Sequence, residues 1–378
     1  MKADIDQLKK NNHGKTNYLT HNFHTYPAKY IPQIPRYFIE KFTKPGDRVY
    51  EPFLGCGTTL VECKLLGRDG IGIDLNPIAT LISKSKTQEL NQIQIDTLRK
   101  FISNIEKQKI KKKDFFLQYE KLNKLEFANK DHWFKKNVQV ELSYIRYQIK
   151  KNKDHFIQDF LNVALSSIIV EVSNQESDTR YVAKNKTIDD FQTLGTFNKK
   201  CLMMIDRILA FSEVSLRSNV EIYTQSSCDV PFIANNSCDF VITSPPYANT
   251  YDYYLYHKSR MNWLEFDYKK VQEGEIGSRD KHSSRRLGID TFLNDLELCF
   301  SEISRVLKKG KYAVIVIGDS VIRGEFHDAK EFTEVIFKKH GFKLAEYSSQ
   351  NLKETTRMFN PKFTNSLKNE HILVFKKL

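Results

Sequence analysis

The chain has 378 residues, enough for one large domain or two ordinary ones, and 40% of them are hydrophobic, which allows a packed core. Its formal net charge of +13 fits a polyanionic partner such as nucleic acid, although solvated lysine-rich surfaces would give the same excess. No apolar stretch could span a bilayer and the first residues lack the apolar core of a signal peptide, so we expect a soluble, cytoplasmic protein without a membrane partner.

The N-terminal part of the chain is predicted to open a parallel sheet. After a polar start, prolines interrupt regular structure until a helix at 36–42. The elements predicted next are a strand at 48–51, a helix at 60–66, a strand at 70–74 and a helix that starts near Pro77. A strand, a glycine-rich loop, a helix and a second strand in this order are typical of a βαβ unit.

Residues 89–215 have few strand signals. Apolar residues recur there at helical spacing, among them Leu98, Ile102, Ile105, Leu142, Ile145 and Ile149. We therefore predict a mostly helical insertion at 89–215, which divides an α/β domain into the parts 1–88 and 216–378.

The α/β pattern resumes after the insertion. The predicted elements are strands at 220–223 and 239–243, a polar loop at 269–288, a helix at 292–307, a turn at 308–311, a strand at 312–317, a helix at 332–340 and a final pair of strands at 342–347 and 372–375. Strands and helices that alternate on both sides of the insertion indicate the α/β fold class.

A glycine loop, from Glu51 to Thr58, follows the first predicted strand. Between a strand and a helix N-terminus, glycines let the backbone approach a ligand and turn free N–H groups toward it. Asp74, 17 residues after Gly57, ends the next strand, where an acid can hold ribose hydroxyls. An ordinary turn is the alternative, and the third glycine of the dinucleotide fingerprint is missing, which disfavours a nicotinamide cofactor.

The strand at 239–243 ends in Ser244-Pro245-Pro246-Tyr247. Two consecutive prolines stiffen the backbone and offer carbonyl oxygens but no N–H, so this edge of the sheet is rich in acceptors. The Ser244 hydroxyl adds an acceptor, and the Tyr247 ring adds a flat face on which a base can stack. Acceptors that hold both hydrogens of a base amine can aim its lone pair at a methyl donor. A plain proline turn is the alternative, which the glycine loop elsewhere in the chain disfavours.

With these motifs the chain resembles the DNA amino-methyltransferases, the family that makes N4-methylcytosine or N6-methyladenine. The family's catalytic tetrapeptide matches the residues Ser244 to Tyr247. Its Asp-Pro-Phe-x-Gly-x-Gly motif matches residues 51–57, with Glu51 in place of the commoner aspartate. The resemblance implies a Rossmann-like methyltransferase fold with a mostly parallel, seven-stranded sheet and helices on both faces, and it leaves the insertion unmatched.

The resemblance also implies S-adenosylmethionine as the cofactor. The segment 23–29 is similar to the family's N-terminal cofactor segment, which would lie near the methionine part. The residues predicted to bind the cofactor are Phe23, Thr25, Pro27, Glu51, Pro52, Phe53, Gly55, Gly57, Thr58, Asp74, Asn76 and Asp229. The six cysteines form no CxxC pair, so we expect buried, reduced thiols and no metal site, and direct methyl transfer needs no cysteine nucleophile.

The serine that begins the tetrapeptide favours the N4 amine of cytosine as the target, because adenine enzymes of the family more often carry Asp or Asn there. The cofactor motif precedes the catalytic motif in this chain, whereas many serine-type members have the opposite order. Methylation of adenine at N6 therefore stays open as the alternative. The remaining alternatives are a methyltransferase that acts on RNA or protein and a catalytically idle DNA-binding module.

The partner implied by the resemblance is double-stranded DNA, and a restriction endonuclease that cleaves the same site is expected as a functional partner. The enzyme would flip the target base out of the duplex, and the insertion would help to recognise the site. Aromatic and basic residues that suit an unpaired base and its phosphates are Arg180, Tyr251, Tyr253, His257, Lys258, Arg260, Arg279 and Arg285. The alternatives to DNA contact are that the tyrosines pack on the core, that the residues near 180 cap a helix, and that the loop is simply solvated.

Overall fold

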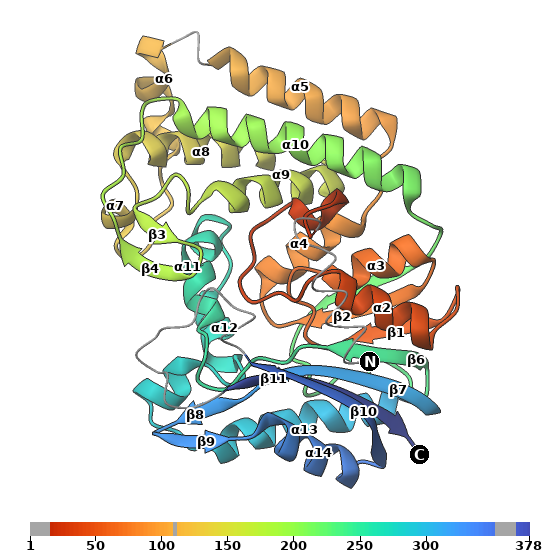
Figure 1. The fold of residues 1–378 in the computed structure, drawn as a ribbon. Helices are drawn as coiled ribbons and strands as arrows, with labels where there is room; N and C mark the ends of the chain where they lie inside the picture. The colour runs from red at the N-terminus through yellow and green to blue at the C-terminus, as the bar shows by residue number, and fades with distance from the viewer. Residues whose placement is uncertain (1–15, 109–111, 352–367) are drawn as a thin grey trace.

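A seven-stranded sheet forms the centre of the computed structural model, which describes residues 16–108, 112–351 and 368–378 (Figure 1). The strands are β1 (Arg48–Glu51), β2 (Asp69–Asp74), β5 (Val220–Thr224), β6 (Cys238–Thr243), β7 (Leu307–Gly318), β10 (Phe342–Asn351) and β11 (Asn369–Lys377). Their order is β10-β11-β7-β6-β1-β2-β5. Neighbours from β7 to β5 pair in parallel, and β11 pairs antiparallel with both β7 and β10. This topology confirms the predicted α/β, Rossmann-like, mostly parallel sheet.

Strand β1 lies inside the sheet next to β6, at the point where the order of the strands reverses. From β1 the chain continues to β2, passes through the insertion to β5 on the same side, and then crosses to β6 and β7 on the other side. In open α/β sheets, ligands bind beyond the carboxyl ends of the strands at such a switch point. The topology therefore predicts a ligand site beyond Glu51 of β1 and Thr243 of β6.

Helices cover both faces of this sheet (Figure 1). Because side chains alternate along a strand, Val49 and Phe240 belong to the core of one face, and Tyr50 and Val241 to the core of the other. The helices on the first face are α2 (Gln33–Phe42) and α3 (Thr58–Leu66), and those on the second are α13 (Ile289–Val306) and α14 (Ala329–Lys339). Every residue of β6 is buried, as expected for a strand between two helical layers.

The insertion is mostly helical, as predicted, and lies across the top of Figure 1. Its elements are α5 (Gln92–Gln108), α6 (Lys112–Tyr119), the short helix η2 (Glu120–Leu122), α7 (Lys130–Trp133), α8 (Lys136–Lys150), α9 (His155–Ile168), the hairpin of β3 (Gln175–Ser177) and β4 (Arg180–Ala183), and α10 (Gln192–Val214). It shares one buried cluster with α4 (Pro77–Thr87) and α11 (Tyr253–Trp263), to which Ile82, Phe160 and Trp263 belong. The insertion is thus packed onto the sheet-bearing part of the chain.

The segment predicted as a polar loop at 269–288 contains helical structure. Helix α12 (Tyr268–Gly274) begins at a cap in which the Asp267 side chain accepts hydrogen bonds from the backbone N–H groups of Lys269 and Lys270. A π-helical turn, η3 (Asp280–Ser284), follows it. The loop prediction was therefore wrong for much of this segment, because it overlooked the aspartate cap.

Two further differences concern strands. The predicted turn at 308–311 lies inside β7 at a shift of register, because Cys238 pairs with Leu307 whereas Phe240 pairs with Tyr312. The short elements that had no counterpart in the sequence-based prediction are the hairpin β3–β4, the hairpin of β8 (Ser320–Ile322) and β9 (Glu325–His327), and the 3₁₀ helix η1 (Leu19–Asn22). Within the described ranges, none of the helices is both long and apolar enough for a membrane span.

Candidate active site

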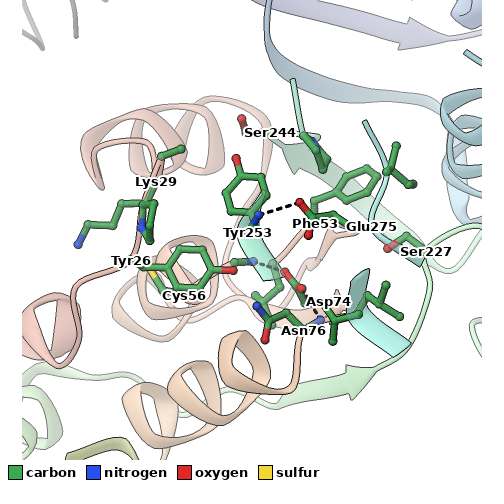
Figure 2. Close-up of a pocket in the computed structure, with 18 of the residues that line it drawn as sticks. Tyr26, Lys29, Phe53, Cys56, Asp74, Asn76, Ser227, Ser244, Tyr253 and Glu275 are labelled. Atoms are coloured by element: carbon green, nitrogen blue, oxygen red, sulfur yellow. Dashed lines mark hydrogen bonds between the residues drawn. The ribbon is translucent and has the colours of Figure 1, made fainter. Parts of the chain in front are cut away.

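A cavity lies where the topology predicts it, beyond the carboxyl ends of β1, β2, β5 and β6 (Figure 2). It has about 930 Å³ of empty space, including its open mouth. Residues of both predicted motifs line it: Phe53, Gly55 and Thr58 from the glycine loop, and Ser244 and Pro246 from the tetrapeptide. Two motifs that lie far apart in the sequence therefore face one shared space.

The Asp74 carboxylate holds the glycine loop in place. One of its oxygens accepts a hydrogen bond from the Gly55 N–H (2.8 Å), and the other accepts one from the Asn76 N–H (2.8 Å). Burial raises the pKa of Asp74 to about 6, and these two bonds oppose that rise. The Asn76 side chain also caps α4 by accepting from the Ile78 N–H (2.9 Å). The acid predicted from the sequence thus lines the cavity and shapes it.

Gly57 is the point where the loop passes into α3. Its φ of +77° lies in the left-handed region, and a Cβ placed there would meet Ser83 Oγ at 2.6 Å and Ser83 Cα at 3.0 Å. Gly57 does not line the cavity; it lets the loop lie directly against α4. The cradle therefore needs glycine here for both its backbone conformation and its space.

Gly57→Ala is expected to lower the free energy of unfolding by about 3 kcal/mol, because the strained backbone and the clash with Ser83 add up. The matched control is Gly46→Ala, since Gly46 has a similar φ of +85° but nothing within 4 Å of its Cβ position. That variant should lose only about 1 kcal/mol. Urea denaturation measures both, and equal losses would contradict the packing role of Gly57.

Glu51 and Pro52 lie behind the cavity wall and do not line it. Glu51 is buried and accepts hydrogen bonds from the hydroxyls of Thr59 (2.7 Å) and Tyr30. Burial raises the pKa of Glu51 to about 7. The Pro52 carbonyl accepts a hydrogen bond from the Ser227 hydroxyl. Both residues therefore support the loop from behind, and the cofactor contacts predicted for them would be indirect.

The N-terminal segment forms one wall, but through different residues than predicted. Pro27 lines the cavity, together with Tyr26, Lys29 and Tyr30. Of the two other predicted residues, Phe23 is buried in the core, with its ring centroid 6.0 Å from that of Phe160, and Thr25 is exposed and does not line the cavity. Phe23 and Thr25 therefore do not reach the cavity as predicted, because the segment turns its tyrosines and Lys29 toward the cavity instead.

The wall beyond β5 consists of Ser226 and Ser227. Asp229, which was predicted to lie near the adenine, is exposed and does not line the cavity. The loop turns between these positions: the Gln225 amide donates to the Asp229 carbonyl (3.2 Å), which leaves the Asp229 side chain outside. At this strand end Ser226 and Ser227 face the cavity, and the predicted residue Asp229 does not.

Glu275 is a cavity residue that the sequence did not reveal. Its carboxylate accepts hydrogen bonds from the backbone N–H groups of Tyr253 and Tyr254 (both 2.8 Å) and so caps α11. Burial raises the pKa of Glu275 to about 8. Tyr253, predicted to contact DNA, lines the cavity beside it (Figure 2). Only the folded chain brings this glutamate to the start of a helix that begins 22 residues earlier in the sequence.

The tetrapeptide continues β6 at the mouth of the same cavity. Ser244 and Pro246 line it, and Pro245 is buried behind them. The Tyr247 ring lies so close to Gly318 that a Cβ there would meet the ring at 2.6 Å, and the Tyr247 hydroxyl donates to Glu370 Oε1 (2.9 Å). Burial raises the pKa of Tyr247 well above its ordinary value. The ring is thus held by β7 and β11.

The residues predicted to contact DNA separate into exposed and buried groups. Arg180 is exposed and pairs with Glu176 (3.2 Å), Arg279 is exposed, and Arg285 is exposed and pairs with Asp280 (2.9 Å). Tyr251 and Lys258 are half-buried, and the Lys258 ammonium lies 4.5 Å from the centre of the Tyr268 ring. These side chains can reach a partner without a change of fold.

His257 and Arg260 are fully buried, which argues against the DNA contacts predicted for them. The His257 ring stacks on Tyr26, with centroids 4.8 Å apart. The Arg260 guanidinium donates to the carbonyls of Ser166 (3.0 Å) and Tyr256 (3.1 Å) and pairs with Asp178. Both side chains instead connect α11 to the N-terminal segment and to the insertion.

The lining of the cavity fits S-adenosylmethionine. Asp74 and Glu275 offer carboxyls to ribose hydroxyls and to positive charge, and Lys29 can pair with a carboxylate. Phe53, Tyr26 and Tyr253 offer aromatic faces, which suit both a purine and a cation. The backbone of the glycine loop approaches the cavity closely, as a cradle for a nucleoside requires.

Comparisons with known proteins identify chains that are similar to this one. The model of a family described as DNA methylase (N6_N4_Mtase) matches residues 4–85 and 238–378. The Type II methyltransferase M.MjaII of Methanocaldococcus jannaschii is 25% identical over 90% of this chain and 78% of its own length. M.MvaI of Kocuria varians, also a Type II methyltransferase, is 26% identical over 86% of this chain and 82% of its own length. A solved SAM-dependent methyltransferase from Methanosarcina mazei aligns over 94% of this chain and 99% of its own, with 9% identity and a TM-score of 0.35.

Proposed function

Since the chain belongs to the DNA methylase family, whose model matches more than half of it, we propose that it transfers a methyl group from S-adenosylmethionine to the N4 amine of cytosine in duplex DNA. We further propose that it is the modification enzyme of a restriction–modification system, as its relatives are named Type II methyltransferases. A restriction endonuclease would then be its functional partner. The observation that carries the proposal is the shared cavity, which Asp74 and Ser244 both line.

The cofactor would lie along the glycine loop. S-adenosylmethionine supplies an electrophilic methyl group on a sulfonium centre. Asp74 would accept the ribose hydroxyls, Lys29 would pair with the carboxylate of the methionine part, and Ser226 and Ser227 would border the other end. Glu275 holds the N-terminus of α11 and thereby fixes the wall that carries Tyr253.

The target amine would meet the tetrapeptide. A stacked base cannot reach a buried cofactor, so the base must leave the duplex, and Tyr247 would stack on it. The Ser244 hydroxyl and the Pro245 carbonyl would accept the two amine hydrogens and orient the nitrogen lone pair toward the methyl group. The serine at position 244 supports cytosine over adenine, and N6-methylation of adenine is the second candidate.

The exposed cations would bind the DNA backbone. Arg180 on the hairpin β3–β4 and Arg279 and Arg285 around η3 would contact phosphates, because all three side chains are exposed and the ion pairs of Arg180 and Arg285 are weak in water. Under this proposal the insertion at 89–215 supplies site recognition, and the parts 1–88 and 216–378 supply catalysis.

Transfer of tritium from labelled S-adenosylmethionine tests the acceptor class. We expect label in duplex DNA and none in RNA or protein. Label in RNA or protein instead would overturn the proposal, and a chain that fails to bind the cofactor in calorimetry would be an idle DNA-binding module.

The affinity for S-adenosylmethionine is expected to rise from about pH 5 to about pH 8. Burial raises the pKa of Asp74 to about 6 and that of Glu275 to about 8, so both carboxyls hold protons at low pH and ionise as the pH rises. Ionised carboxylates favour the positively charged sulfonium. Calorimetry across this range should show a steeper rise for S-adenosylmethionine than for S-adenosylhomocysteine, which lacks that charge. Glu275→Gln should flatten the upper part of the rise. An equal pH dependence of the affinity for both ligands would contradict the assignment of Asp74 and Glu275 to the cofactor site.

A further inference from the structure

Two cysteines from distant parts of the chain meet beside the cofactor cavity. Cys228 follows β5 and Cys299 lies in α13, and their sulfurs are 3.3 Å apart. A disulfide bond measures about 2.05 Å, so the two sulfurs are little more than 1 Å from bonding distance. We propose that Cys228 and Cys299 form a redox-active dithiol site, which reacts with small-molecule disulfides and closes an internal disulfide.

The two thiols differ in the way that such a reaction needs. Cys228 is half-buried and can be reached from solvent, whereas Cys299 is fully buried behind it. A hydrogen bond from the Cys299 thiol lowers the pKa of Cys228 to about 7, and Lys281 favours the thiolate further, while burial and Asp295 oppose this. The same contact and burial raise the pKa of Cys299. Cys228 is therefore the attacking thiolate and Cys299 the thiol that resolves the intermediate.

The exchange balances in two steps. The Cys228 thiolate attacks one sulfur of a small disulfide, which forms a mixed disulfide and releases one small thiolate. The Cys299 thiol then loses its proton to that thiolate. The resulting Cys299 thiolate attacks the Cys228 sulfur, forms the Cys228–Cys299 bond and releases the second small thiolate. This thiolate takes a proton from the solvent. Two protein thiols are oxidised, and one small disulfide is reduced to two thiols.

The remaining cysteines do not offer this chemistry. Cys63, Cys201 and Cys238 are buried, and burial raises the pKa of each thiol. Cys56 lines the cofactor cavity, and Lys86 and Lys29 lower its pKa, so it is the one competing thiol. Among the described residues, the side-chain partner of the Cys56 sulfur is the Thr58 hydroxyl, at 3.7 Å, rather than a second sulfur. A mixed disulfide would therefore persist at Cys56 but not at Cys228.

The site is joined to the cavity wall through its neighbours. The Cys228 N–H donates to Ser226 Oγ (3.2 Å), and the Ser227 hydroxyl donates to the Pro52 carbonyl. Because Ser226 and Ser227 line the cavity, drawing Cys228 toward α13 would displace this wall. Oxidation should therefore weaken cofactor binding, a consequence that rests on the proposed function.

Mass spectrometry of the full chain treated with oxidised glutathione tests the site directly. We expect a loss of about 2 Da and a cross-linked pair of peptides that contain Cys228 and Cys299. Cys299→Ser should stop at a glutathione adduct on Cys228, Cys228→Ser should form neither product, and the control Cys238→Ser should close the disulfide as the natural chain does. A glutathione adduct that persists on Cys228 of the natural chain, or no reaction at Cys228, would overturn the proposal, whatever the chain methylates.

Calorimetry with S-adenosylmethionine tests the consequence. Oxidation of the natural chain should raise the dissociation constant about threefold or more, dithiothreitol should restore it, and Cys228→Ser should show no change under the same treatment. An unchanged constant in the cross-linked chain would overturn the link to the cavity. A loss of affinity that persists in Cys228→Ser would assign the effect to Cys56, and it would also overturn the link between the Cys228–Cys299 site and the cavity.

Discussion

Ser244→Ala is expected to lower the rate of methyl transfer about 100-fold. Ser244 lines the cavity just after β6, and its hydroxyl would accept one hydrogen of the target amine. Without this acceptor the amine is held less firmly, and its lone pair stays conjugated with the ring, so the loss falls on the chemical step. Single-turnover kinetics on duplex DNA measures that step, and the affinity for S-adenosylmethionine should change by less than about threefold.

The matched control is Ser301→Ala. The Ser301 hydroxyl donates to the Leu298 carbonyl within its own helix (2.7 Å), and Ser301 does not line the cavity. This variant should methylate DNA at the natural rate. Full activity in Ser244→Ala would remove Ser244 from the mechanism, and an equal loss in both variants would indicate a general effect on folding.

Asp74→Ala is expected to raise the dissociation constant for S-adenosylmethionine about 100-fold. The substitution removes the acceptor of two backbone N–H groups, those of Gly55 and Asn76, as well as the proposed ribose contact. Each hydrogen bond to a charged group contributes about 1.5–3 kcal/mol, so the loss of loop order and of the contact adds up to at least this factor. Calorimetry measures the constant, and circular dichroism checks that the variant is folded.

Two variants separate the local effect from a general one. Asp74→Asn keeps one acceptor oxygen and should show an intermediate loss of about tenfold. Asp229→Ala removes an exposed acid that does not line the cavity, so its affinity should stay within about twofold of the natural chain. A large loss in Asp229→Ala would restore the sequence-based assignment of this residue to the cofactor site.

The sequence predicted the parallel part of the fold well, because local signals repeat there. The strand at 48–51, the glycine loop and the acid at 74 lie within one βαβ unit, and residues close in sequence also lie close in space. The strand before Ser244 contains the apolar run Phe240-Val241-Ile242, which is typical of a strand buried on both faces. The helix α12 was missed because the polar composition of this segment is typical of a loop, whereas the side chain of one residue, Asp267, caps a helix there.

The cavity was only partly predictable, because part of its wall depends on tertiary packing. Glu275 meets the start of α11 only in the folded chain, and Ser226 and Ser227 line the cavity where Asp229 was expected. His257 and Arg260 resembled phosphate ligands because basic residues near an active-site motif usually are exposed. In the structure Arg260 is paired with Asp178, a partner 82 residues away that no local pattern indicates.

Methylation-sensitive sequencing of DNA from cells that express this chain tests the central claim most directly, because it identifies the modified base and its sequence context together. N4-methylcytosine is expected at one recurring site, and no modification is expected in cells that express Ser244→Ala. Methylation confined to the N6 amine of adenine would contradict the cytosine assignment, and unmodified DNA from a folded, cofactor-binding chain would contradict the proposed function.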